Sequence, residues 1–73
     1  MPRYFFHVAD GEDLPDEVGT ILPNTAAARV QAIATAGAML ADRGPTFWGG
    51  TEWRMTVVNE AGVRVCLLRF SAE

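Results

Sequence analysis

The fold class follows from residues 53–70, which read WRMTVVNEAGVRVCLLRF. Two runs rich in β-branched and other apolar residues, 53–59 and 63–70, flank a short loop that ends in Gly62. Such runs favour strands, and a three-residue loop with glycine last is typical of a type I turn followed by a G1 bulge. The stretch therefore predicts an antiparallel hairpin in which Gly62 has a positive φ.

The register of this hairpin depends on the loop length. A three-residue loop pairs Val57 with Val65, and further along it pairs Met55 with Leu67. A four-residue loop would instead set Val57 against Arg64. A one-step shift changes which side chains share a face, so we prefer the first register, which collects a clean apolar face.

A further strand is predicted at residues 3–9, RYFFHVA, where aromatic and β-branched residues dominate. Alternation puts Tyr4, Phe6 and Val8 on one face of the sheet and Phe5 and His7 on the other. An acidic loop at residues 12–17 follows, and then a brief strand at residues 20–22 that ends at Pro23.

A helix is predicted from Asn24 or Thr25 to about Arg43, because either side chain can cap its first turn. Gly44-Pro45 is typical of a helix end. An apolar stripe at three-to-four spacing is expected to face the sheet. Its members are Ala26, Val30, Ile33, Gly37 and Leu40.

The order strand, short strand, helix, strand, strand predicts an α+β fold: a small antiparallel sheet of three to four strands with one helix packed on one face. With 73 residues and no internal repeat, the chain is expected to be a single domain over residues 1–73. Sequence alone does not give the order of the strands in the sheet.

The sheet face opposite the helix is expected to be about half apolar, whereas a free sheet face is normally polar. Contiguous exposed apolar surface usually marks a binding partner, so a homodimer through this face is the leading hypothesis, with another protein as a possible partner. The alternative is that loops or the C-terminal segment of the same chain cover the patch. The candidate interface residues are Phe5, His7, Arg54, Val58, Arg64, Leu68 and Phe70.

Catalysis is not expected. The single histidine, His7, and the single cysteine, Cys66, cannot form the usual zinc site within one chain, and no phosphate loop, Ser/His/Asp set or cofactor motif is present. His7 is interpreted as a strand histidine and Cys66 as an inert packing residue. The acidic residues between Asp10 and Glu17 lack EF-hand spacing. We therefore expect a non-enzymatic protein without metal or cofactor.

A second hypothesis is a ligand- or single-stranded nucleic-acid-binding module that uses the same face, through Arg54, Arg64, Phe5 and Phe70. The net charge of −3 disfavours nucleic acid. No stretch approaches the length of a membrane helix, and no signal peptide is recognisable. With a lone cysteine, these features favour the cytoplasm. Phe47 and Trp48 are a candidate loop contact, because flanking glycines would let them reach a partner.

The opening PRYFFH at residues 2–7 is followed by Asp10-Gly11, by DEVG at residues 16–19 and by Leu22-Pro23 before an alanine-rich helix. This pattern resembles a family of short uncharacterised bacterial proteins that are grouped as a domain of unknown function. The resemblance covers nearly the whole chain, and its N-terminal run is the most specific part. It implies a small, stand-alone bacterial cytoplasmic protein, and it implies no activity, substrate or catalytic residue.

Overall fold

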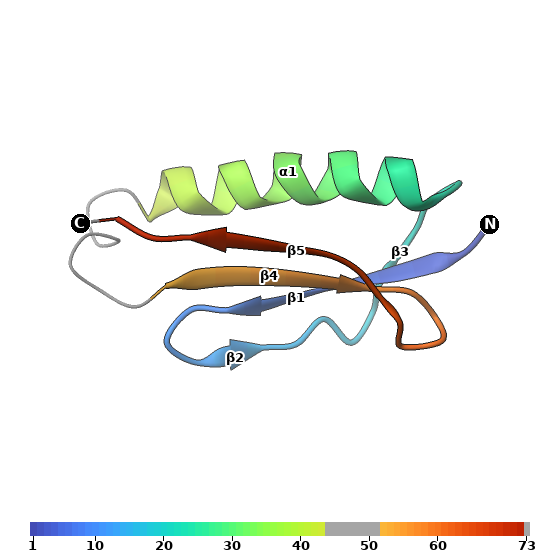
Figure 1. Cartoon of the computed structure of the whole chain (residues 1–73), viewed down its shortest axis with the longest axis horizontal. Coiled ribbons are helices and arrows are strands. Elements are labelled where there is room, and N and C mark those ends of the chain that lie inside the picture. Colours follow the sequence, from blue (N-terminus) through green and yellow to red (C-terminus); the bar gives the residue numbers. More distant parts are fainter. Residues whose placement is uncertain (44–51, 73) are drawn as a thin grey trace.

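The structure is a computed structural model that describes residues 1–43 and 52–72 (Figure 1). The elements are β1 (Arg3–Ala9), β2 (Asp13–Leu14), β3 (Thr20–Ile21), α1 (Thr25–Asp42), β4 (Trp53–Val58) and β5 (Arg64–Phe70). All strand pairs are antiparallel, in the order β2-β1-β4-β5, and β3 also pairs with β1. The helix α1 covers one face, so the predicted α+β class is confirmed.

The bounds predicted for β1 are confirmed, and the brief strand expected at residues 20–22 is present as β3. β2 was not predicted. It is only two residues long and pairs with the end of β1 at Val8 and Ala9. Its residues, Asp13 and Leu14, carry no strand pattern, because backbone pairing alone makes this strand.

The predicted helix cap is confirmed. The side chain of Asn24 accepts a hydrogen bond from the backbone N–H of Ala27 at 2.9 Å, which satisfies one free donor of the first turn. The other end is fixed by an ion pair between Arg43 and Asp10, which ties the end of α1 to the turn after β1. The predicted stop at Gly44-Pro45 lies outside the described residues.

The prediction for the sheet-facing side of α1 is wrong. Val30 and Ile33 are 71% and 64% exposed, whereas Ala28, Ala32 and Ala36 are at most 4% exposed. The cause is the spacing between layers. Alanines at i, i+4 and i+8 form a stripe of small side chains that lets the helix sit close to the sheet, and this excludes the larger stripe.

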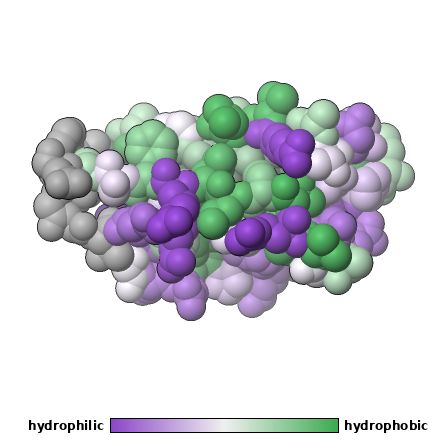
Figure 2. All heavy atoms as spheres, viewed as in Figure 1, coloured by the Kyte–Doolittle hydropathy of each residue, from purple (hydrophilic) through white to green (hydrophobic). Residues whose placement is uncertain are grey.

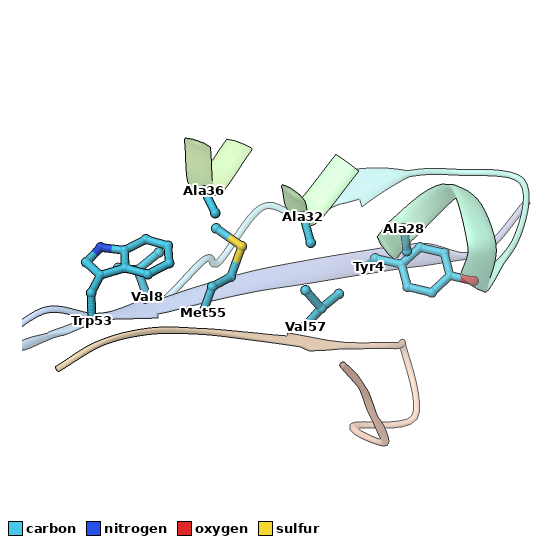
Figure 3. Close-up of a cluster of buried hydrophobic side chains, with 8 residues drawn as sticks. All are labelled: Tyr4, Val8, Ala28, Ala32, Ala36, Trp53, Met55 and Val57. Carbon is cyan, nitrogen blue, oxygen red and sulfur yellow. The ribbon is translucent and has the colours of Figure 1, made fainter. Parts of the chain in front are cut away.

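The core therefore has large side chains on the sheet and small ones on the helix (Figure 3). Trp53, Met55 and Val57 of β4 are fully buried beneath the alanine methyl groups of α1, and Tyr4 and Val8 of β1 complete the layer. Among the described residues, the indole N–H of Trp53 has no hydrogen-bond acceptor, which costs about 1–3 kcal/mol when a donor is buried. Apolar burial has to offset this cost.

The hairpin of β4 and β5 has the predicted turn but a different register. Gly62 has a φ of 80°, as expected for the last residue of a G1 loop. Val58 pairs with Arg64, which agrees with a three-residue loop, but Val57 then pairs with Cys66 instead of Val65. A bulge at this point inserts one extra residue in β5, and every pair beyond it is shifted by one.

The Asn59 side chain adds to the backbone hydrogen bonds of the turn, in which Asn59 N–H donates to the carbonyl of Val63 and Gly62 N–H donates to the carbonyl of Asn59. The Oδ1 atom of Asn59 accepts the backbone N–H groups of Ala61 at 2.9 Å and Val63 at 3.0 Å. Glu60 accepts the backbone N–H of Arg3 at 2.8 Å, which links the turn to the start of β1. The hairpin is therefore fixed to the neighbouring strand at its tip as well as along its length.

Candidate functional site

The strand register defines two faces of the sheet: the helix face beneath α1 and the outer face opposite. Directly paired residues share a face, and Val8–Met55 and Phe6–Val57 are pairs of the helix face. The outer face consists of three rows across β1, β4 and β5. The rows are Phe5–Val58–Arg64, His7–Thr56–Leu67 and Ala9–Arg54–Arg69.

Five of the seven predicted interface residues share the outer face, namely Phe5, His7, Arg54, Val58 and Arg64. The other two do not. Leu68 pairs with Met55, and Phe70 pairs with Trp53, so both lie on the helix face, and the assignment of these two residues to the outer face is wrong. The bulge near Val57 is the cause, because it moves each following side chain of β5 to the opposite face.

Phe5 is partly covered by its own chain. Gly19 has a φ of 78°, and a Cβ atom placed on it would lie 2.9 Å from the Phe5 ring and 2.8 Å from the Arg3 side chain. Only glycine allows this backbone conformation and this close approach. Arg3 also donates a hydrogen bond to the carbonyl of Val18 at 2.8 Å. The apolar character expected of the outer face is thereby reduced.

His7 is held between two neighbours. Its ring stacks on that of Phe5 with 6.4 Å between centroids, and its Nδ1 atom accepts the backbone N–H of Asp16 at 3.0 Å. A ring that accepts at Nδ1 carries its proton on Nε2 in the neutral state. His7 therefore offers one N–H donor to the outer face.

The Asp16 side chain lies beside the part of the β1 edge that neither β2 nor β3 pairs with, and it accepts a backbone hydrogen bond there. Its carboxylate accepts the backbone N–H groups of Phe6 at 3.1 Å, Val18 at 3.0 Å and Gly19 at 3.0 Å. The Gly19 amide is the largest cause of a pKa below the usual value of 3.8; the Phe6 and Val18 amides and the charge of His7 add to it, and burial opposes it. The side chain thus substitutes for the strand that is missing here.

Charged side chains lie close together on the outer face near the start of β4. Glu52 accepts hydrogen bonds from Arg69 at 3.3 Å and 3.2 Å, and its carboxylate is 3.8 Å from the Nε atom of Arg54. Both carboxylate oxygens are therefore used by Arg69. The Arg54 guanidinium keeps its N–H donors for another acceptor, because 3.8 Å is too long for a hydrogen bond.

A hollow of about 440 Å³ opens beside these groups, and we call it the outer-face hollow. Its lining residues come from β1, β2, β4 and the residue after β2. They are His7, Val8, Ala9, Asp13, Leu14, Pro15, Arg54 and Thr56. Thr56, Leu14 and Pro15 were not predicted as site residues, because two of them belong to a segment that reads as a solvated acidic loop.

The second surface lies on the other side of the molecule. It combines the exposed side of α1 with β5, and we call it the α1/β5 surface; it consists of Val30, Ile33, Gly37, Leu40, Leu68 and Phe70. Five of these six residues, together with Ala36 and Arg69, line an apolar hollow of about 430 Å³. Figure 2 shows green hydrophobic patches along α1 and β5, with purple hydrophilic side chains between them and along the lower side of the view.

The sequence contained the signal for this surface. Helix α1 carries two apolar stripes, one of alanines and one of larger residues, and only one of them can face the sheet. Phe70 of β5, which lines the same apolar hollow as Ile33 and Leu40 of the larger stripe, is 53% exposed. The larger stripe was read as core because size normally indicates burial.

The remaining candidates carry little chemistry. Burial raises the pKa of the Cys66 thiol, the charge of Arg29 partly offsets this, and the side chain packs against the core. Among residues 1–43 and 52–72, no three His, Cys, Asp or Glu side chains are grouped as a metal site would need. In the same ranges, no helix has the length and apolar character needed to cross a membrane. Phe47 and Trp48, the candidate loop contact, lie outside the described residues.

These features define a small α+β protein with a polar hollow on its sheet and an apolar surface along its helix. The chain belongs to the family described as Domain of unknown function (DUF6894), whose model matches residues 3–71. The predicted resemblance to a family grouped as a domain of unknown function is thereby confirmed. No match was found among curated proteins or among solved structures.

Proposed function

We propose that this protein is a non-enzymatic interaction module that forms a homodimer through the α1/β5 surface. The observation that carries the proposal is the exposure of large apolar side chains along one side of α1, with Val30 71% and Ile33 64% exposed beside Phe70 at 53%. Exposed apolar side chains in a contiguous patch are usually covered by a partner. We place the protein in the cytoplasm, in keeping with its lone cysteine.

A second copy fits this surface because both of its elements can pair with themselves. β5 is an edge strand of the described sheet, and α1 runs beside it in the same direction (Figure 1). A two-fold axis that lies just outside the edge of β5, level with its middle, is therefore also level with the middle of α1. It pairs each element antiparallel with its own copy, which extends the sheet and packs helix on helix.

The charges on β5 allow this arrangement. When Leu67 lies opposite Leu67 of the second copy, Arg64 lies opposite Phe70 and Arg69 lies opposite Val65. No two arginines then face each other, whereas a register shifted by one residue would set Arg64 against Arg69. Like charges directly opposite each other are unfavourable in a sheet, so the first register is preferred.

The size of the surface is adequate. A stable interface buries roughly 800 Å² per partner, about a sixth of the 4780 Å² of accessible surface of this chain. Helix α1 has 18 residues and is about 27 Å long, and it runs along the long axis of a body measuring 39 × 19 × 17 Å. One long side of the molecule provides this area.

Sedimentation analysis of the wild type and two variants tests the proposal. We expect the wild type to be a dimer and Ile33→Glu to be a monomer, because a carboxylate would be buried without a partner at the interface. Val18→Glu is the matched control, since Val18 is 76% exposed and lies away from this surface; it should remain a dimer.

Two results would contradict the proposal. A wild-type monomer at high micromolar concentration would remove the homodimer. A dimer that survives Ile33→Glu and dissociates in Val58→Glu would move the interface to the outer face of the sheet.

A further inference from the structure

The outer-face hollow brings together three donor groups that donate no hydrogen bond to the described residues, although Arg54 also forms an ion pair with Glu52 at 3.8 Å. His7 and Thr56 are direct cross-strand neighbours, and Arg54 is two residues further along β4 on the same face. Nδ1 of His7 is occupied by the Asp16 amide, so its Nε2–H is the available donor. Among the described residues, neither the Thr56 hydroxyl nor the Arg54 guanidinium makes a hydrogen bond.

Three donors of this kind select an oxyanion. Guanidinium and imidazole N–H groups and a hydroxyl all donate to carboxylate or phosphate oxygens, and the guanidinium adds a positive charge. The volume of about 440 Å³ lies within the range of small-molecule sites. The donors stand on strands of the sheet, which hold them more firmly than a loop would.

The rest of the lining narrows the ligand class. Ala9, which pairs with Arg54 on the outer face, and Pro15 give the hollow an apolar side, which favours an oxyanion attached to a hydrocarbon body. Asp13 also lines the hollow, and Glu52 is near Arg54, so two carboxylates repel a second negative charge on the ligand. A monoanion is therefore favoured over a phosphate dianion.

We propose that the outer-face hollow binds a small monocarboxylate with an apolar body. The carboxylate accepts hydrogen bonds from Arg54, Thr56 and Nε2 of His7, and the hydrocarbon part lies against Ala9 and Pro15. This site is on the opposite side of the sheet from the α1/β5 surface, so ligand binding and self-association are separate properties of the protein.

The test is a titration of the ¹⁵N-labelled protein, followed by two-dimensional NMR, with benzoate, acetate and inorganic phosphate as probes. We expect saturable shifts at His7, Thr56 and the Arg54 side chain, with benzoate bound more tightly than acetate or phosphate. Arg54→Gln should weaken benzoate binding at least about tenfold, because it removes a charged hydrogen bond, and Thr56→Val should weaken it severalfold.

Two variants distinguish binding in the outer-face hollow from nonspecific attraction of an anion to positive charge on the same face. Arg64→Gln removes an arginine of the same face that does not line the hollow, and it should change benzoate affinity less than about twofold. Asp13→Asn should tighten binding. Three results would overturn the proposal. One is an equal loss of affinity in Arg54→Gln and Arg64→Gln, and another is equal affinity for phosphate and benzoate. The third is binding that is not saturated by about 20 mM benzoate, because a specific site of this kind binds more tightly than that.

Discussion

Asp16 lies in the gap between β2 and β3, and its two carboxylate oxygens accept three backbone N–H groups from β1 and from its own turn. Its backbone N–H donates to His7 in return. A strand with unpaired N–H groups would otherwise be exposed at this edge. One side chain therefore closes the edge of β1 over the stretch that β2 and β3 leave open.

We expect Asp16→Asn to lower the free energy of unfolding at pH 7 by about 1–3 kcal/mol, because the amide has one acceptor oxygen and its NH₂ group faces backbone donors. Asp13→Asn is the control, with an expected change within about 0.5 kcal/mol, since the Asp13 side chain makes no hydrogen bond to a described residue. Urea denaturation at fixed protein concentration measures both.

The stability difference between wild type and Asp16→Asn should depend on pH. The pKa of Asp16 is lowered in the folded state, chiefly by the Gly19 amide, so its stabilisation is fully present above the ordinary value of 3.8 and is lost as the pH falls through the lower folded pKa. The difference between wild type and Asp16→Asn should therefore shrink below about pH 4. A difference that stays constant down to the acid transition would show that the carboxylate charge is irrelevant.

The helix shows how close contact selects small residues. Ala28, Ala32 and Ala36 are in contact with a layer of large side chains on β1 and β4, so the distance between helix and sheet is set by methyl groups (Figure 3). The larger apolar residues then have no place between the layers. They remain on the flank of the helix, next to β5.

We expect Ala32→Leu to destabilise the protein by about 1–3 kcal/mol, because three extra carbons have to enter a closed layer. Ala34→Leu is the same chemical change on the exposed side of α1 and should alter the free energy of unfolding by less than about 0.5 kcal/mol. Thermal or urea unfolding gives both values. A neutral Ala32→Leu would mean that the helix can move away from the sheet at little cost.

The sequence predicted the elements well and their faces less well. β1, the cap at Asn24 and the positive φ of Gly62 follow from local chemistry, and all three are confirmed. The register of β5 depends on a bulge beside Val57, and no residue type marks a bulge of this kind. The outer-face assignment of Leu68 and Phe70 failed for this reason alone.

The candidate site could be predicted only in part for a related reason. The alternation of side chains along the two predicted strands already put His7 and Arg54 on the outer face, and the structure places both at the outer-face hollow. Leu14 and Pro15 reach the hollow because the chain returns along β1 after the turn, and this long-range pairing leaves no local signal. The position of the α1/β5 surface required knowledge of which helix stripe is buried.

At the scale of the whole molecule, the hydrophobic core of the described residues is small. Within residues 1–43 and 52–72, the buried core contains eight residues, three of them alanine, and no grouped metal site is present; the single cysteine of the chain cannot form an intrachain disulfide. A domain of this size rarely gains more than ~3–5 kcal/mol from its own core. Burial of the α1/β5 surface in a dimer would add to this margin, so stability should depend on protein concentration.

Hydrogen exchange of the β5 amides tests the proposed sheet extension directly. In a monomer, alternate N–H groups of β5 point away from β4 and exchange rapidly, because β5 is the edge of the described sheet. In the proposed dimer, the same groups donate to the second copy, so their exchange should slow as protein concentration rises. Amides of β1 and β4 between Phe5–Val58 and Val8–Met55 lie inside the sheet and serve as the internal reference. Ile33→Glu should restore rapid exchange at the β5 edge without changing that reference. If the wild type dimerises and the β5 edge still exchanges rapidly at every concentration, the helices alone form the interface and the two sheets remain separate.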